Sequence, residues 1–147
     1  MKTLKIAAAV SMLAAPAFAD GHAASGNGDA ANGEAQFARQ CVSCHVVADA
    51  DGNVLAGRAA KTGPNLFGVA GRTVGSVDGF RYGDAIVEVG AGGTVWTEAD
   101  FVPYVQDPTT WLRTTLDNNR ARSKMSYKVR DEQDAIDLYA YLSTFGE

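Results

Sequence analysis

The pattern of apolar and polar positions predicts a helix near each end of this chain. After Asp131, apolar side chains recur at the spacing of one helix face, at Ala135, Leu138, Tyr139 and Leu142. A second helix is expected to run from Asp29 toward Cys41, because the Asp29 carboxylate can cap its first backbone N–H groups.

Two short helices are predicted after Thr97. Thr97 and the acidic residues behind it form a capping pattern that opens the first of them. Pro103 should keep this helix short or kinked, because a proline removes one backbone hydrogen bond. Asp107 and Pro108 then fit the N-cap and the first position of the next helix.

Glycine dominates the middle of the chain. Residues 49–93 contain eleven of the sixteen glycines and lack sustained alternation, so we expect irregular loop there and no strand. The pattern therefore indicates an all-α domain of short helices joined by long Gly-rich loops. Loops of this length are uncommon in compact domains, which suggests that a large group occupies the centre of the fold.

The first nineteen residues have the features of a secretory signal peptide. They begin with MKTLK, continue with an apolar run and end with Ala17-Phe18-Ala19, a small-residue cleavage site. The apolar run is too short to span a bilayer, which takes roughly 20 residues, so we expect no membrane span and export to the periplasm. Residues 1–19 are assigned to the signal peptide, 20–28 to a flexible tail and 29–147 to one domain.

Charge gives no indication of a nucleic-acid partner. The net charge of −4 becomes −6 when Lys2 and Lys5 leave with the signal peptide, which is the opposite of a basic nucleic-acid footprint. Between Arg113 and Arg130, however, six basic residues accompany Asp117 alone. Such a charge run either solvates a long loop or marks a docking surface.

Both cysteines of the chain lie in C-V-S-C-H, at Cys41 and Cys44, directly before His45. A zinc site would need a fourth ligand, and a redox dithiol would accompany a βαβ pattern that is not visible here. A disulfide across so small a loop would restrain little of the unfolded chain. C-x-x-C-H is the attachment signature of a c-type haem, so we predict one covalently bound haem c per chain, held by two thioethers and an imidazole.

The sixth ligand of the haem iron is predicted to be Met125. Met125 is the only methionine outside the predicted signal peptide, and it lies in the polar, basic segment SKMSYK, where the usual core role of methionine does not fit. Ligation by His45 and Met125 raises the reduction potential and leaves no open site on the iron. That arrangement favours one-electron transfer and argues against an enzyme.

Further motifs follow in order: TGPNLFGVAGR at 62–72, GFRYGDA at 79–85, TVW at 94–96 and SKM at 123–125. With these motifs, the chain closely resembles the class I c-type cytochromes, and within them the cytochrome c2 group, from about residue 29 to about residue 145. The resemblance implies the small cytochrome c fold, with loops wrapped around one haem.

The resemblance also implies roles for individual residues. The carbonyl of Pro64 should accept the Nδ1 proton of His45 and so orient the ring. The residues implied to bind the haem propionates are Arg72, Tyr82 and Trp96. Tyr104 and Ser123 resemble hydrogen-bonding neighbours of the Met125 sulfur and the inner propionate, with core aromatic and surface hydroxyl as the alternative roles.

Two structural features belong to the same comparison. Gly33 and Phe37 resemble one side of the family's packed crossing of first and last helices, and Leu138 and Tyr141 resemble the other. Ile86 is a departure, because the family often buries an asparagine there. The chain also has 16 residues between His45 and Thr62 and an extended segment 112–123.

These observations together predict a soluble, monomeric, periplasmic one-electron carrier. The resemblance implies a cytochrome bc complex as electron donor, and a photosynthetic reaction centre, a terminal oxidase or both as acceptor. An acidic partner would be steered by a basic docking surface composed of Lys61, Arg120, Arg122, Lys124 and Lys128. Two alternatives stay open: a c-type haem domain dedicated to one periplasmic enzyme, and a haem catalyst or gas binder with a displaceable sixth ligand.

Overall fold

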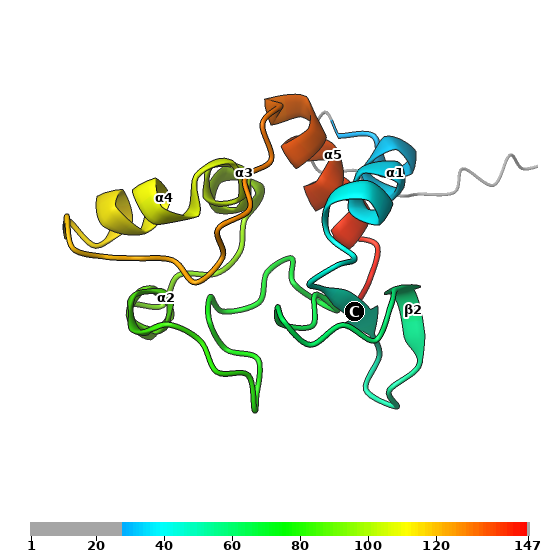
Figure 1. Ribbon diagram of the computed structural model, residues 1–147, viewed down its shortest axis with the longest axis horizontal. Coiled ribbons are helices and arrows are strands. Elements are labelled where there is room, and N and C mark those ends of the chain that lie inside the picture. The colour runs from blue at the N-terminus through cyan, green and yellow to red at the C-terminus, as the bar shows by residue number, and fades with distance from the viewer. Residues whose placement is uncertain (1–27, 147) are drawn as a thin grey trace, which may run out of the picture.

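The computed structural model describes residues 28–146, and Figure 1 shows their arrangement. The predicted signal peptide and residues 20–27 of the predicted tail lie outside the described residues. The elements are α1 (Ala30–Gln40), β1 (Val46–Ala48), β2 (Val54–Gly57), α2 (Asp84–Ala91), α3 (Glu98–Gln106), α4 (Pro108–Thr115) and α5 (Glu132–Leu142). Among the described helices, none has the length and apolar character that crossing a membrane requires.

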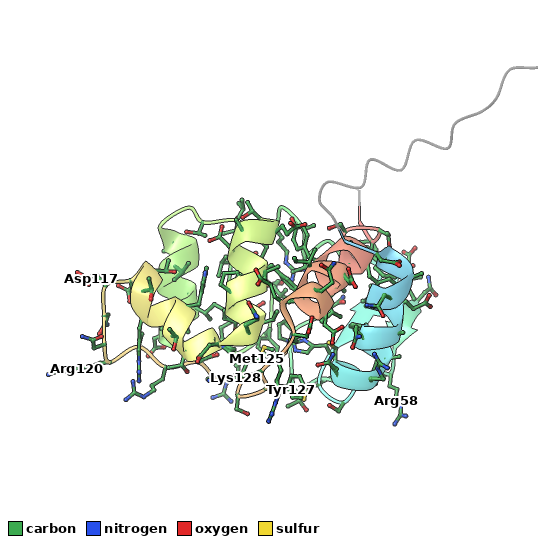
Figure 2. The ribbon with its side chains drawn as sticks, turned by 90° about the horizontal axis from the view of Figure 1, so that it is seen from above. Arg58, Asp117, Arg120, Met125, Tyr127 and Lys128 are labelled. Atoms are coloured by element: carbon green, nitrogen blue, oxygen red, sulfur yellow. The ribbon has the colours of Figure 1, made fainter. Side chains whose placement is uncertain are left out.

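The first and last helices pack tightly against each other, as the family resemblance implied. Figures 1 and 2 show α1 and α5 side by side, and a Cβ added at Gly33 would lie only 2.0 Å from the Asp137 carbonyl oxygen. Phe37 of α1 contacts Tyr141 of α5, with ring centroids 5.8 Å apart. The absence of a side chain at Gly33 thus allows the backbones to approach closely and bury Phe37 and Leu138.

The helix starts follow the predicted capping residues. The carboxylate of Asp29 accepts hydrogen bonds from the first turn of α1, and Asp131 does the same for α5. Thr97 and Asp107 cap α3 and α4. Pro103 lies inside α3, and that helix ends after nine residues at Gln106, which confirms the prediction of a short helix.

The prediction of irregular loop over residues 49–93 is wrong in two places. The strands β1 and β2 form an antiparallel hairpin, in which the Asp49 carboxylate accepts hydrogen bonds from the backbone of Asp51 and Asn53. Strands of three and four residues are too short to show a clear alternation. The helix α2 was also missed, because its N-cap is Gly83, which offers no side-chain hydrogen bond, and because its β-branched residues favour strand.

An aromatic cluster connects Trp96 with the helices α3, α4 and α5. Trp96 stacks on Trp111 of α4 at 5.4 Å and contacts Tyr104 of α3 at 4.8 Å between ring centroids. Phe101 of α3 in turn contacts Tyr139 of α5 at 5.4 Å. Helix α3 packs against both α4 and α5. The aromatic cluster therefore holds these three helices in place relative to one another.

Candidate haem-binding site

The described residues enclose a cavity of about 310 Å³ between the helices and the loops. A cavity of this size falls in the range of small-molecule and cofactor sites. Its lining comes from the end of α1 and the turn after it, the loop 62–83, α3, the segment 122–129 and α5, together with Ile86 of α2 and Trp96. Cys41, Cys44, His45 and Met125 all line it, so the fold brings residues separated by up to 84 positions to one cavity.

The end of α1 presents the C-x-x-C-H motif to this cavity. Cys41 is the C-cap of α1, and its carbonyl accepts hydrogen bonds from the backbone N–H groups of Cys44 and His45 at 3.1 and 2.9 Å. No disulfide joins these two cysteines in the part of the chain that the structure describes. Burial, and then the neighbouring Cys44, raise the pKa of Cys41 to about 12, which disfavours the thiolate that a redox dithiol needs. The folded site therefore does not favour dithiol chemistry.

The imidazole of His45 is held from two sides. Its Nδ1 lies 2.9 Å from the Pro64 carbonyl oxygen, which leaves Nε2 available to bind a metal. A Cβ at Gly63 would lie only 2.4 Å from the ring, so only glycine permits this loop to pack on His45. Burial lowers the pKa of His45 more strongly than the Pro64 hydrogen bond raises it, and the neutral form is the one that ligates a metal.

Arg72, Tyr82 and Trp96 line the same cavity, as the resemblance implied. The guanidinium of Arg72 donates to the carbonyls of Phe67 and Asn65 at 2.7 and 3.1 Å, whereas its buried Nε has no hydrogen-bond partner among the described residues. A buried donor without a partner is costly, and a carboxylate such as a haem propionate would satisfy it. The donor set of the cavity therefore fits the predicted haem.

The phenol of Tyr104 and the hydroxyl of Ser123 line the same cavity as Met125. The Ser123 Oγ accepts a hydrogen bond from the Met125 backbone N–H at 3.1 Å. Burial raises the pKa of Tyr104, and a hydrogen bond with Ser123 partly offsets this rise, so the phenol stays protonated. Ile86, the departure from the family pattern, lines the cavity with an apolar side chain.

The predicted docking residues do not gather in one place. Arg122 and Lys124 line the cavity, and Lys61 is exposed next to the lining residue Thr62. Lys128 forms an ion pair with Asp107 at 2.6 Å. Figure 2 shows Arg120 at the far end of the molecule from Met125, beyond α4. Of the five residues, the structure brings only Arg122 and Lys124 directly to the cavity.

Several lining residues were not singled out from the sequence, among them Gln40, Gly63 and Tyr127. Gln40 and Gly63 directly precede Cys41 and Pro64, and Tyr127 follows Met125 by two positions. Proximity to the predicted ligands was the only available signal. Their role becomes visible only when the fold places them around one cavity.

The comparisons with known proteins agree with this geometry. No protein-family model matches the chain. It is similar to a cytochrome c2 from Rhodovulum adriaticum, with 54% identity over 120 residues, 82% of this chain and 94% of that protein. It is 44% identical to a cytochrome c-551 from Roseobacter denitrificans over 97% of this chain and 94% of that one. A solved cytochrome c2 from Rhodobacter sphaeroides matches with a TM-score of 0.78 and 45% identity, covering 80% of this chain and 96% of that one.

Proposed function

The chain belongs to the cytochrome c2 family of class I c-type cytochromes, and we propose that it is a soluble, monomeric periplasmic carrier with His45 and Met125 as haem ligands. As a member of this family it carries one covalently attached c-type haem and serves as an electron carrier. The observation that carries the proposed attachment residues and iron ligands is that Cys41, Cys44, His45 and Met125 all line one cavity.

The roles of these residues follow from their chemistry. Cys41 and Cys44 would hold the haem covalently, each through a thioether to one of its vinyl groups. The bound haem supplies a one-electron Fe(III)/Fe(II) couple. The hydrogen bond to Pro64 and the contact with Gly63 hold the His45 ring in one orientation. The thioether of Met125 would be the second protein ligand of the iron; it would favour the reduced state and keep small molecules from binding the iron.

Arg72, Tyr82 and Trp96 bind the haem propionates in this proposal. The donors would be the phenol of Tyr82, the indole N–H of Trp96 and the Nε of Arg72, which has no hydrogen-bond partner among the described residues. Burial raises the pKa of Tyr82, so its hydroxyl keeps its proton and can donate. Tyr104 and Ser123 line the Met125 side of the cavity, and the Ser123 Oγ accepts a hydrogen bond from the Met125 backbone N–H.

Substitution of Met125 tests the ligand assignment against a catalytic or gas-binding haem. The wild-type ferric protein should show a methionine-to-iron charge-transfer band and bind cyanide or azide slowly. Met125→Ala should lose this band and bind both anions quickly. Fast anion binding by a wild type that lacks the band would favour the catalyst or gas binder and contradict the proposal.

The proposed redox partners are a cytochrome bc complex as donor and a photosynthetic reaction centre, a terminal oxidase or both as acceptor. Arg122 and Lys124 at the cavity and Lys61 beside it support docking of an acidic partner at the haem edge. Lys61→Glu with Arg122→Glu should slow association with the acceptor and weaken its salt dependence. Arg122→Glu alone and Arg120→Glu, at the far end of the molecule, change the charge equally and form the matched pair; equal effects from these two single variants would contradict docking at the cavity.

Export and oligomeric state have direct tests. The mature protein recovered from the periplasmic fraction should begin at Asp20, which mass spectrometry of the intact chain measures. Sedimentation should give the mass of one chain with one haem. Retention of residues 1–19 in a cytoplasmic fraction, or a dimeric mass, would contradict these parts of the proposal. A carrier dedicated to one enzyme would instead copurify with that enzyme and fail to reduce the diffusing acceptors.

A further inference from the structure

A single hydrogen bond joins the haem-attachment helix to the segment that carries Met125. The Tyr127 hydroxyl donates to the Gln40 Oε1 at 2.9 Å, across 87 positions of the sequence. Both residues line the cavity. Gln40 is the last residue of α1 and precedes Cys41, and Tyr127 follows Met125 by two residues. The bond therefore spans the cavity edge between the cysteines and Met125.

The Gln40 side of this bond is fixed by two helices. The Gln40 Nε2 donates to the Gln36 Oε1 at 2.6 Å, and the Gln36 Nε2 donates to the Asp134 carboxylate at 2.5 Å. Gln36 is only 5% exposed. Because this chain of amides is anchored in the packed crossing of α1 and α5, the Gln40 carbonyl oxygen is a preorganised acceptor.

The Tyr127 end of the hydrogen bond is less firmly held by the surrounding structure than the Gln40 end. Tyr127 is 48% exposed and lies between α4 and α5, where residues 121–131 form no helix or strand. Buried Val129 anchors the far end of this segment through a backbone hydrogen bond to Val105 at 2.9 Å. On the other side of Met125, the Lys124 ammonium donates to the carbonyls of Arg81 and Tyr82 at 2.9 and 2.8 Å. Side chains on both flanks thus hold the Met125 segment in place, and Figure 2 shows Met125 and Tyr127 along one edge of the molecule.

We infer that the Tyr127–Gln40 hydrogen bond is a latch that keeps the Met125 segment closed over the haem and so limits how often Met125 leaves the iron. This inference rests on the proposed function, because it requires Met125 as the sixth ligand. The bond exists only when the segment is closed, so its loss raises the open fraction. A competing ligand binds only the open state, and its apparent dissociation constant is the intrinsic constant divided by that fraction.

Imidazole titration of the ferric holoprotein measures the open fraction. Removal of one net hydrogen bond should make Tyr127→Phe bind imidazole about three- to tenfold more tightly than the wild type. Gln40→Leu should have at least the same effect. The double variant Tyr127→Phe with Gln40→Leu should bind no more tightly than Gln40→Leu, because the two single changes remove the same bond.

Tyr139→Phe is the matched control. It also removes a phenol hydrogen bond, from the Tyr139 hydroxyl to the Trp96 carbonyl at 3.1 Å, but it leaves the latch intact, so its imidazole affinity should equal that of the wild type. An equal gain in Tyr139→Phe would assign the effect to general loss of stability and overturn the latch. If Gln40→Leu does not fold, the comparison of Tyr127→Phe with Tyr139→Phe is sufficient.

The charge-transfer band separates failure of the latch from failure of the proposed function. Its absence from the wild type would overturn Met125 ligation, and the latch with it. If the band is present and Tyr127→Phe binds imidazole with wild-type affinity, the latch alone is overturned. The band together with a tighter, Gln40-dependent affinity in Tyr127→Phe would support both.

Discussion

Gly33→Ala tests the crossing of α1 and α5, because two physical effects predict opposite changes in the free energy of unfolding. Within an exposed helix, alanine is more favourable than glycine by about 1 kcal/mol. In this structure, however, the new Cβ would lie 2.0 Å from the Asp137 carbonyl oxygen and 2.7 Å from the Tyr141 Cβ. Restoring normal contact requires the helices to separate by about 1 Å or more. Phe37 and Leu138, now 2% and 1% exposed, would then lose packing.

The packing loss should exceed the gain in helix propensity. Overpacking typically costs about 1–3 kcal/mol and sometimes more, and here the clash is with backbone that no rotamer change relieves. We expect the free energy of unfolding of the holoprotein to fall by about 2–4 kcal/mol, as measured by urea denaturation. Ala35→Gly, at an exposed position of α1, is the control and should cost only about 1 kcal/mol. An unchanged or increased stability of Gly33→Ala would refute the tight crossing.

Three further predictions concern individual polar groups. Burial raises the pKa of Asp137, but hydrogen bonds from Asn32, the backbone of Asp29 and Gln133 outweigh burial and hold that pKa below 3.8. The ionised carboxylate should therefore stabilise the fold above pH 3.8. This contribution should be lost as the pH falls through the pKa of Asp137 in the folded protein. Urea unfolding at a series of acid pH values should show a shallower loss of stability in Asp137→Asn, and an unchanged slope would contradict this assignment. Lys128→Ala breaks an exposed ion pair with Asp107 and should lower stability by less than about 1 kcal/mol; a larger loss that persists at high salt would show a structural role instead. Arg72→Lys removes the donors to the Phe67 and Asn65 carbonyls and should destabilise the holoprotein by about 1–3 kcal/mol in thermal or urea unfolding, whereas a neutral effect would show that the forked geometry is dispensable.

The parts of the fold that were predictable depend on local chemistry. Asp29 and Asp131 cap the helices they precede, and capping involves only the next few backbone groups. The C-x-x-C-H motif is likewise contained in one turn at the end of α1. Short strands and the helix α2, which begins at Gly83 without a side-chain cap, have no comparable local signal and depend on the surrounding tertiary structure.

The partners of charged and polar side chains were not predictable for the same reason. The basic residues Lys124 and Lys128 appear as a free charge run in the sequence, but their ammonium groups bind the Arg81 and Tyr82 carbonyls and the Asp107 carboxylate. The Tyr127–Gln40 bond joins residues 87 positions apart. Such pairs exist only after α1, α5 and the Met125 segment have come together around the cavity.

Met125 offers a direct test of the central claim, because it is the only methionine once residues 1–19 have been removed. Holoprotein exported with ¹³C-methyl-labelled methionine should therefore give one methyl resonance in the NMR spectrum of the reduced state. If the Met125 sulfur binds the iron, its methyl group lies against the face of the macrocycle, and the ring current should shift the resonance far upfield. A resonance at the position of a free methionine side chain in the reduced protein would contradict His45/Met125 ligation and the carrier function built on it.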